Sequence, residues 1–194
     1  MLATHNSMTY LPAVNPFFNL FSFLWRCQNR TEFGQTLLGA DYLDFRVAFR
    51  KGRLTFAHGI VDLQTPPGGV IFAIKDMDAF VKGFRVVLER GSEEDAAKLR
   101  TLLAQAKLRH LTHIIIKKDW RIIFQRKRPG VPASIIDHSF VPFTSDKPWY
   151  KQLGLHIINY PKRYARRHNG CVIRARADEY HLHFYDFINI SRSR

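Results

Sequence analysis

The alternation of β-prone and helix-prone segments in the first hundred residues constrains the fold more than any other sequence feature. Residues 41–49 form a β-prone run, residues 53–58 follow as its hairpin partner, and residues 84–89 form a further strand pattern. Residues 70–83 carry apolar side chains at helical spacing, and Ser92 opens a capping-box pattern ahead of an amphipathic helix. Because helices between strands are typical of parallel crossovers, the pattern predicts an α/β fold with a mainly parallel sheet.

The second half is rich in predicted strands and poor in clear helices. The predicted strands cover residues 112–116, 121–125, 155–159, 171–174 and 181–190. A complete eightfold βα barrel usually needs about 250 residues, with about 200 near the lower limit. A chain of 194 residues therefore predicts one domain, residues 1–194, and any barrel it forms must be shortened or irregular.

Composition and cysteine spacing exclude several classes of protein. Hydrophobic residues make up 46% and charged residues 24%, which is close to globular averages and unlike a disordered chain. Cys27 and Cys171 have no CxxC spacing, so neither a zinc site nor a disulfide framework is predicted. The apolar stretch at residues 17–25 is too short for a membrane span, and no signal peptide is recognised. Cellular location stays unknown, with a cytoplasmic or peripheral membrane position as the default.

Positive charge is concentrated in the second half of the chain. The net charge is +14, and residues 101–194 carry 18 basic and only 6 acidic side chains. Such a field attracts phosphate groups of a nucleic acid, an anionic membrane surface or a phosphorylated metabolite. A generally basic surface without a specific partner is the alternative.

Four short stretches place polar side chains on otherwise apolar strands. They contain His5, the pair Asp44 and Arg46, His58, and Asp186. Asp44 and Arg46 share one face of their strand because strand side chains alternate. Taken singly, each has a structural alternative: a surface histidine, an ion pair, a turn residue and an exposed acid on an edge strand.

The order of these stretches resembles the catalytic half of phosphatidylinositol-specific phospholipase C. The matching segments are Thr4-His-Asn-Ser7, Gln35 ahead of Gly39, Tyr42-Leu-Asp-Phe-Arg-Val47, His58-Gly59, and Tyr185-Asp-Phe-Ile188. The resemblance is clear over residues 2–65, fades through the middle and returns near the last predicted strand. It implies a TIM-barrel-like phosphodiesterase fold of the short bacterial type.

The resemblance also implies roles for five residues in a general acid–base reaction. His5 matches the general base that takes the proton of the inositol 2-hydroxyl, and Asp186 matches the acid that orients it. His58 matches the general acid for the departing oxygen. Arg46 matches the arginine that neutralises the phosphate, with Asp44 as its companion acid. Two imidazoles and one fixed guanidinium suit this chemistry on general grounds as well.

Asn6 departs from the bacterial pattern, in which an aspartate follows the first histidine. Calcium-dependent eukaryotic members have asparagine there as a metal ligand, but they carry an acid where this chain has Arg46. A guanidinium at that position repels a cation, so a metal-independent site without a cofactor is expected. Calcium held by Asn6 and Asp44 is the alternative.

Substrate contacts and a lipid-facing surface are further candidates. Asn6, Arg85, Glu89 and Lys117 are the candidate substrate-binding residues, although strand-end charges in contact with solvent are an equal interpretation. The aromatic run at residues 17–25 suits insertion into a lipid surface, with the basic half held on anionic headgroups, or else core packing.

The leading functional hypothesis is cleavage of an inositol phospholipid or a related phosphodiester. The main alternative is a degenerate barrel that binds nucleic acid or an anionic membrane surface through its basic half. A glycerophosphodiesterase ranks lower because the residues around His5 lack the arginine and glutamate partners of that family.

Overall fold

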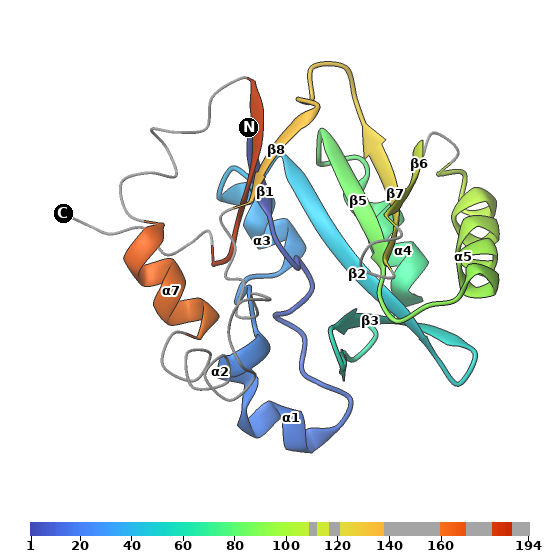
Figure 1. The fold of residues 1–194 in the computed structure, drawn as a ribbon, viewed down its shortest axis with the longest axis horizontal. Coiled ribbons are helices and arrows are strands. Elements are labelled where there is room, and N and C mark those ends of the chain that lie inside the picture. Colours follow the sequence, from blue (N-terminus) through green and yellow to red (C-terminus); the bar gives the residue numbers. More distant parts are fainter. Residues whose placement is uncertain (109–111, 117–120, 138–159, 170–179, 188–194) are drawn as a thin grey trace.

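The fold is one curved sheet with helices on its outer side (Figure 1). The computed structural model describes residues 1–108, 112–116, 121–137, 160–169 and 180–187. The described strands are β1 (Leu2–Thr4), β2 (Tyr42–Arg50), β3 (Arg53–His58), β4 (Val61–Asp62), β5 (Gly83–Leu88), β6 (Thr112–Ile116), β7 (Arg121–Lys127), β8 (Ser134–Asp137) and β9 (His181–Tyr185). The main path of the sheet runs β6-β7-β5-β2-β1-β9-β8, with β3 and β4 attached to β2.

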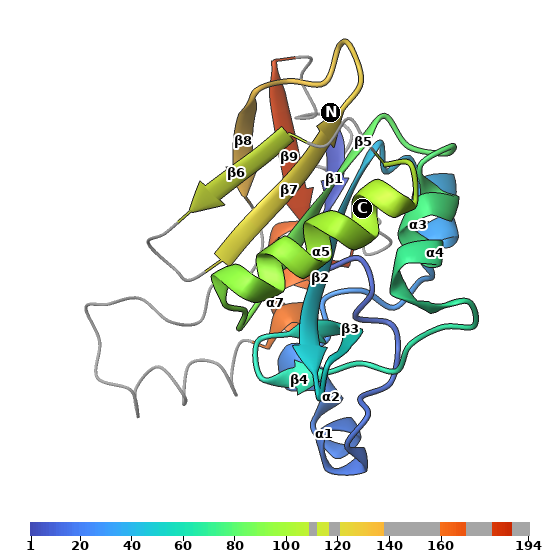
Figure 2. The same cartoon turned by 90° about the vertical axis from the view of Figure 1, so that its right-hand side faces the viewer.

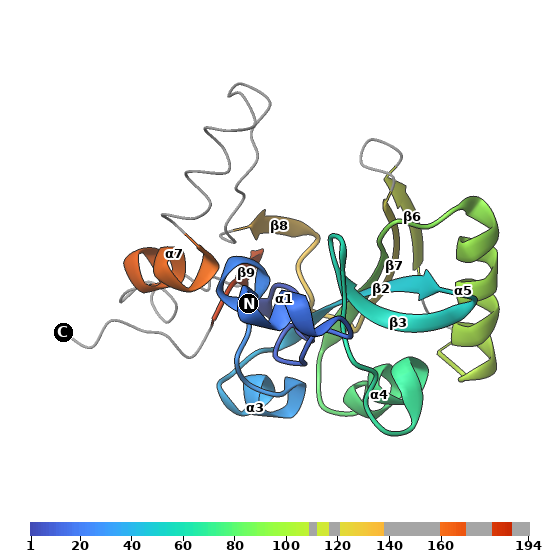
Figure 3. The same cartoon turned by 90° about the horizontal axis from the view of Figure 1, so that it is seen from below.

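Helices surround this sheet. The described helices are α1 (Pro16–Leu20), α2 (Ser22–Trp25), α3 (Glu32–Leu37), α4 (Gly69–Met77), α5 (Glu93–Gln105) and α7 (Pro161–His168). Figures 2 and 3 show α5 lying across the outer side of the strands. None of the helices in the described ranges has the length and apolar character that a bilayer crossing requires.

The sheet confirms the α/β class and the parallel arrangement at its centre. Strands β8, β9, β1, β2 and β5 run parallel to one another, whereas β7 is antiparallel to both β5 and β6, and β3 is antiparallel to β2. Within the described residues β6 and β8 stand at opposite ends of the path, so the sheet is a curled half-barrel. This architecture is consistent with the predicted shortened barrel. The regular alternation of parallel strand and helix ends after β5, because β7 returns in the opposite direction.

Local sequence signals account for the helix boundaries. The Ser92 side chain accepts a hydrogen bond from the Asp95 backbone at 3.2 Å, and the Asp95 carboxylate accepts one from the Ser92 backbone, which completes the predicted capping box. The predicted helix at 70–83 was too long, since α4 ends at Met77. The following chain already pairs with the residue before β2, where the Lys82 backbone N–H donates to the Asp41 carbonyl at 2.9 Å.

The later strand predictions are confirmed in part. Strands β6 and β7 match the predictions at 112–116 and 121–125. The predicted strand at 181–190 ends at Tyr185, and Phe187 takes a positive φ of 48°, which no strand residue adopts. The strands predicted at 155–159 and 171–174 fall outside the described residues.

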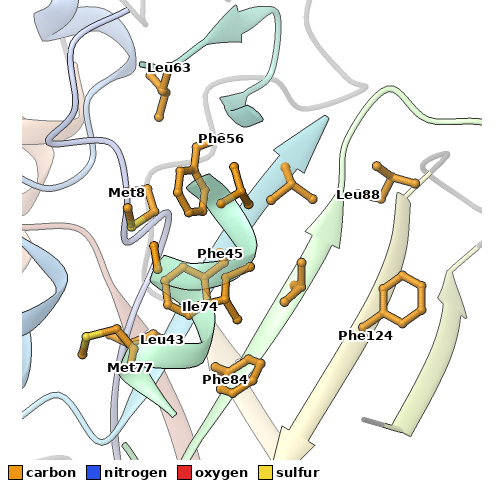
Figure 4. Close-up of a cluster of buried hydrophobic side chains, with 14 of the residues drawn as sticks. Met8, Leu43, Phe45, Phe56, Leu63, Ile74, Met77, Phe84, Leu88 and Phe124 are labelled. Atoms are coloured by element: carbon orange, nitrogen blue, oxygen red, sulfur yellow. The ribbon is translucent and has the colours of Figure 1, made fainter. Parts of the chain in front are cut away.

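The apolar core lies between one face of β2 and the helix α4 (Figure 4). Leu43, Phe45 and Val47 point to this face and are fully buried, and Ile74 on α4 packs with them. The Phe45 ring lies 5.9 Å from the ring of Phe84 on β5, measured between centroids. Because successive side chains of a strand point to opposite faces, the even-numbered residues of β2 point to the concave side, where the polar groups lie.

Replacing Phe45 with alanine tests the dependence of the fold on this core. We expect Phe45→Ala to lower the free energy of unfolding by about 3–5 kcal/mol, because it leaves a cavity among buried side chains. Phe72→Ala is the matched control: Phe72 lies on α4 but is 56% exposed, so its loss should cost less than about 1 kcal/mol. Urea unfolding of both variants measures the difference, and equal losses would contradict the packing of Phe45 in the core.

Candidate active site

Strand pairing brings the two ends of the described chain together at one site. Strand β1 lies between β2 and β9 and runs parallel to both, so that Thr4 pairs with Leu43 on one side and Tyr185 on the other. The residues that follow these positions, His5, Asp44 and Asp186, are therefore neighbours: His5 and Asp186 come directly after β1 and β9, and Asp44 lies within β2. The His5 backbone donates to the Tyr185 carbonyl at 3.1 Å, which fixes this register.

His5 is held by a carboxylate on one side and a guanidinium on the other. Its Nδ1 lies 2.8 Å from Asp186 Oδ1, and both side chains are buried. Its Nε2 lies within hydrogen-bond distance of Arg46 Nη2. A guanidinium only donates hydrogen bonds, so Nε2 carries the lone pair and Nδ1 carries the proton. This tautomer leaves a basic nitrogen directed at Arg46.

Arg46 belongs to a buried network of alternating charges. Its Nε donates to Asp44 Oδ2 at 3.2 Å and its Nη1 donates to Glu89 Oε1 at 2.7 Å. Arg85 Nε donates to the other oxygen of Asp44 at 2.8 Å. Burial alone would raise the pKa of Asp44, but Arg85 and Arg46 hold it well below its usual range. Burial likewise opposes ionisation of Arg46 and Glu89, yet their partners raise the pKa of Arg46 and lower the pKa of Glu89. All three groups are charged at neutral pH.

His58 lies across from His5 and is oriented by the backbone. Its ring stands perpendicular to that of His5 with 6.4 Å between centroids. Its Nδ1 lies 2.6 Å from the Trp25 carbonyl, which can only accept, so Nδ1 donates and Nε2 is the acceptor of the neutral ring. Burial, followed by the charge of Arg46, lowers the pKa of His58 to about 4. In the absence of a bound anion His58 is therefore neutral.

The glycine after His58 connects its turn to the charge network. The Gly59 backbone donates to Glu89 Oε2 at 2.5 Å, so Glu89 joins Arg46 to the end of β3. Gly59 has a φ of 56°, in the left-handed region that favours glycine. The His58-Gly59 pair is thus explained by geometry: one residue faces His5, and the next permits the turn.

Asn6 does not form a calcium cage with Asp44. Its backbone N–H donates to Asp44 Oδ2 at 3.1 Å, while its side-chain Nδ2 lies 3.4 Å from both ring nitrogens of His5 and 3.7 Å from Cys27 Sγ. Both oxygens of Asp44 are covered by guanidinium groups. A hard cation needs several open oxygens, so these residues do not fit calcium.

A different set of metal-ligating atoms lies on the other side of His5. Among the described residues, His5, Cys27 and Asp186 each offer one ligand atom, and these atoms lie within 4.8 Å of one another. Burial, followed by the negative charge of Asp186, raises the pKa of the Cys27 thiol well above its usual value. Cys27 is therefore protonated at neutral pH.

The five candidate catalytic residues His5, Asp44, Arg46, His58 and Asp186 thus meet in one cluster. The candidate substrate-binding residues Glu89 and Arg85 support this cluster as ion partners. Glu89 and Arg85 are ion partners of Arg46 and Asp44, and the Arg85 guanidinium also lies 4.1 Å from the ring centroid of Phe184. Lys117 lies outside the described residues.

Sequence reasoning missed three residues that support this cluster. Trp25 offers the carbonyl that orients His58, and Cys27 lies against His5 and Asp186. The Gln28 side chain donates to the carbonyls of His5 at 3.1 Å and Tyr185 at 3.0 Å, which ties the ends of β1 and β9 together. No local pattern identifies them, because their roles depend on contacts with residues far away in the sequence.

Neutralising the shared carboxylate should destabilise the protein. We expect Asp44→Asn to lower the free energy of unfolding by about 3–5 kcal/mol, because the buried guanidinium of Arg46 and the partly buried guanidinium of Arg85 lose their common counter-charge. The folded-state pKa of Asp44 lies below its unfolded value of about 3.9, so its stabilisation is present above that pH and lost as the pH falls below it. The variant should therefore lose less stability than wild type on acidification below about pH 4.

A matched control is available in the same sheet. Asp62 also bridges two arginines, Arg50 at 3.4 Å and Arg90 at 2.5 Å, but at the surface. Asp62→Asn should cost less than about 1 kcal/mol because solvent screens these pairs. Chemical denaturation of both variants across pH measures the difference. A loss no larger for Asp44→Asn than for Asp62→Asn would show that the buried network does not stabilise the fold.

Comparison with known proteins gives a likeness of fold. No protein-family model matches the chain, and no curated protein matches it by sequence. The structure is similar to that of phosphatidylinositol-specific phospholipase C from Listeria monocytogenes, with a TM-score of 0.56 and 15% sequence identity. The alignment covers 96% of this chain and 87% of that one. The protein therefore has a phospholipase C-like α/β fold built on a curled half-barrel sheet.

Proposed function

We propose that the protein cleaves a phosphodiester by general acid–base catalysis, in the manner of a phosphatidylinositol-specific phospholipase C. The substrate class is an inositol phospholipid or a related phosphodiester. The observation that carries the proposal is the position of His5 between Asp186 at Nδ1 and Arg46 at Nε2. Because a guanidinium only donates, these contacts set the tautomer with a proton on Nδ1 and a lone pair on Nε2. The likeness of fold to the Listeria enzyme supports it.

His5 is the proposed general base. Its Nε2 takes the proton of the attacking hydroxyl, and the resulting imidazolium is stabilised by Asp186 at Nδ1. The attacking oxygen forms a bond to phosphorus as the bond to the leaving oxygen breaks. Gln28 keeps the backbone of His5 beside that of Tyr185, so base and carboxylate stay aligned.

Arg46 is the proposed electrostatic partner of the phosphate. Asp44 and Glu89 fix its Nε and Nη1, which leaves Nη2 directed at His5 Nε2. A phosphate oxygen that accepts from Nη2 would release His5 for the substrate hydroxyl. A guanidinium fixed before the substrate binds needs no reorganisation when charge develops on the phosphate.

His58 is the proposed general acid, and it must become protonated when the substrate binds. The neutral ring has no proton to donate from Nε2. A phosphate anion beside it favours the protonated form and raises its pKa. The Trp25 carbonyl keeps Nδ1–H in place, so Nε2 is the nitrogen that receives a proton and passes it to the leaving oxygen. We propose that no metal takes part, because guanidinium groups cover Asp44.

Cleavage of phosphatidylinositol in mixed micelles tests the proposal. Wild type should be active in EDTA, and His5→Ala and His58→Ala should each lose at least about 100-fold in rate, because each removes a proton-transfer group. His181→Ala is the matched histidine control, because His181 lies on β9 outside the cluster, and it should keep most of the activity. Wild-type turnover in His5→Ala, or activity only with calcium, would overturn the proposed roles of these residues.

An exposed apolar surface supports a lipid substrate. The run at residues 17–25 is largely outside the core: Phe17, Leu20, Phe21 and Phe23 are exposed, whereas Trp25 is buried. This surface adjoins the basic helix α7, where Arg163 and Arg166 are also exposed. Figure 1 shows α1, α2 and α7 on the same side of the molecule. We propose that this side contacts an anionic membrane through inserted apolar groups and headgroup attraction.

Vesicle binding tests this surface with a matched pair of leucines. Leu20→Glu should weaken binding to phosphatidylcholine vesicles containing phosphatidylserine by about tenfold or more, because an apolar side chain that inserts into the membrane becomes charged. Leu37→Glu on α3 should not, although Leu37 is 74% exposed and Leu20 is 75% exposed. Equal effects would exclude α1 as the contact. The alternative, a degenerate barrel that binds nucleic acid, predicts a different result. It would be favoured if the protein cleaves no lipid but binds nucleic acid in a salt-sensitive way that His5→Ala leaves unchanged.

A further inference from the structure

Three different metal-ligating side chains converge on one point beside His5. The atoms are one ring nitrogen of His5, Cys27 Sγ and a carboxylate oxygen of Asp186, all within 4.8 Å of one another. Nδ1 is the ring nitrogen that lies beside Asp186, 2.8 Å from its Oδ1. The three residues come from the end of β1, the segment after α2 and the end of β9, and none is more than 7% exposed. Cysteine spacing alone predicted no zinc site, because it cannot show a cysteine meeting a histidine and an aspartate in space.

The side chain of Asn6 lies beside these three atoms and contains an unpartnered oxygen that can supply a fourth ligand. Its Oδ1 is buried and has no hydrogen-bond partner, and Asn6 as a whole is 2% exposed. Its Nδ2 lies 3.7 Å from Cys27 Sγ and 3.4 Å from His5 Nδ1, so the amide group lies against the cluster. A half-turn about the last side-chain torsion exchanges the two amide atoms and directs Oδ1 toward the cluster.

We propose that His5, Cys27 and Asp186 bind a soft divalent cation, with Zn²⁺ as the best fit and Asn6 Oδ1 as the fourth ligand. A set of one nitrogen, one sulfur and two oxygens suits zinc, whereas calcium prefers oxygen ligands alone. Zinc–ligand distances of about 2.0–2.3 Å place tetrahedral ligand atoms roughly 3.3–3.8 Å apart. Ligand atoms that are now up to 4.8 Å apart must therefore approach by roughly 1 Å, whereas His5 Nδ1 and Asp186 Oδ1, now 2.8 Å apart, must separate slightly.

Zinc binding changes the protonation of both Cys27 and His5. The Cys27 thiol releases one proton to solvent as sulfur bonds to the metal. The proton on His5 Nδ1 moves to Nε2 as Nδ1 bonds to the metal, so one proton leaves in total. His5 Nε2 then has no lone pair for Arg46 or for a substrate hydroxyl. The site is thus a zinc-operated switch that blocks the base, a consequence that rests on the proposed function.

Zinc binding to the full chain, freed of any histidine tag, tests the site without reference to activity. Competition with a chromophoric chelator gives the affinity, and Co²⁺ as a spectroscopic substitute reports thiolate ligation through its charge-transfer absorption. Wild type should bind one equivalent. Cys27→Ala should weaken binding at least about tenfold and lose the thiolate signal. Cys171→Ala is the matched cysteine control and should match wild type in both readouts.

The outcomes separate the site from the proposed reaction. Failure of wild type to bind one equivalent, or unchanged affinity in Cys27→Ala, would overturn the site. Asp186→Asn provides a second variant if Cys27→Ala does not fold: affinity should fall while the thiolate signal remains, and unchanged affinity would again count against the site. If wild type cleaves phosphatidylinositol, zinc should inhibit it reversibly, and Cys27→Ala should resist. Equal inhibition of Cys27→Ala would overturn the switch, whereas absence of cleavage would affect only the proposed function.

Discussion

The rest of the site depends on the pairing of the buried Asp44 carboxylate with the guanidinium groups of Arg46, which is buried, and Arg85, which is partly buried. This carboxylate fixes Arg46 and Arg85 on the concave face of β2 and β5, and its Oδ2 also accepts from the backbone of Asn6. Charges removed from water are costly unless they are paired and hydrogen-bonded, so each member of the network needs the others. Glu89 extends the same network to the turn that carries His58. Arg46 contacts His5 and Glu89 contacts the turn after His58, so both imidazoles are connected to this network of charges.

The alternation of side chains along β2 divides the molecule into two environments. Phe45 and its odd-numbered neighbours enter the apolar core against α4, whereas Asp44 and Arg46 face the concave side. A half-barrel is enough to do this, because the site needs only the parallel strands β9, β1, β2 and β5 and the end of β3, which carries His58. The strands beyond them, β6, β7 and β8, widen the sheet without contributing a residue to the described cluster.

Local patterns were sufficient for the elements that depend on local interactions. The strand at 41–49, its hairpin partner and the capping box of α5 all follow from periodicity and short-range hydrogen bonds. The apolar spacing that predicted α4 continues past the true end of the helix. The end was missed because it is set by pairing of the following residues with Asp41, which the spacing does not show. The sequence also indicated the cluster around His5, through an ordered resemblance and not through any single residue. Trp25 and Cys27 could not be found in that way. Trp25 acts through its backbone carbonyl, which has no sequence signature, and Cys27 belongs to no spaced cysteine motif.

The bridge made by Gln28 has a consequence for the order in which the chain folds during synthesis. It joins the carbonyls of His5 and Tyr185, and His5 pairs with an acid 181 positions further along the chain. During synthesis β1 can pair with β2 early, but its other edge stays open until β9 emerges from the ribosome. Contacts of such long sequence separation form late because loop closure must precede them. A nascent chain therefore carries its histidine without the carboxylate that sets its tautomer, and the machinery becomes complete only when the last described strand is in place.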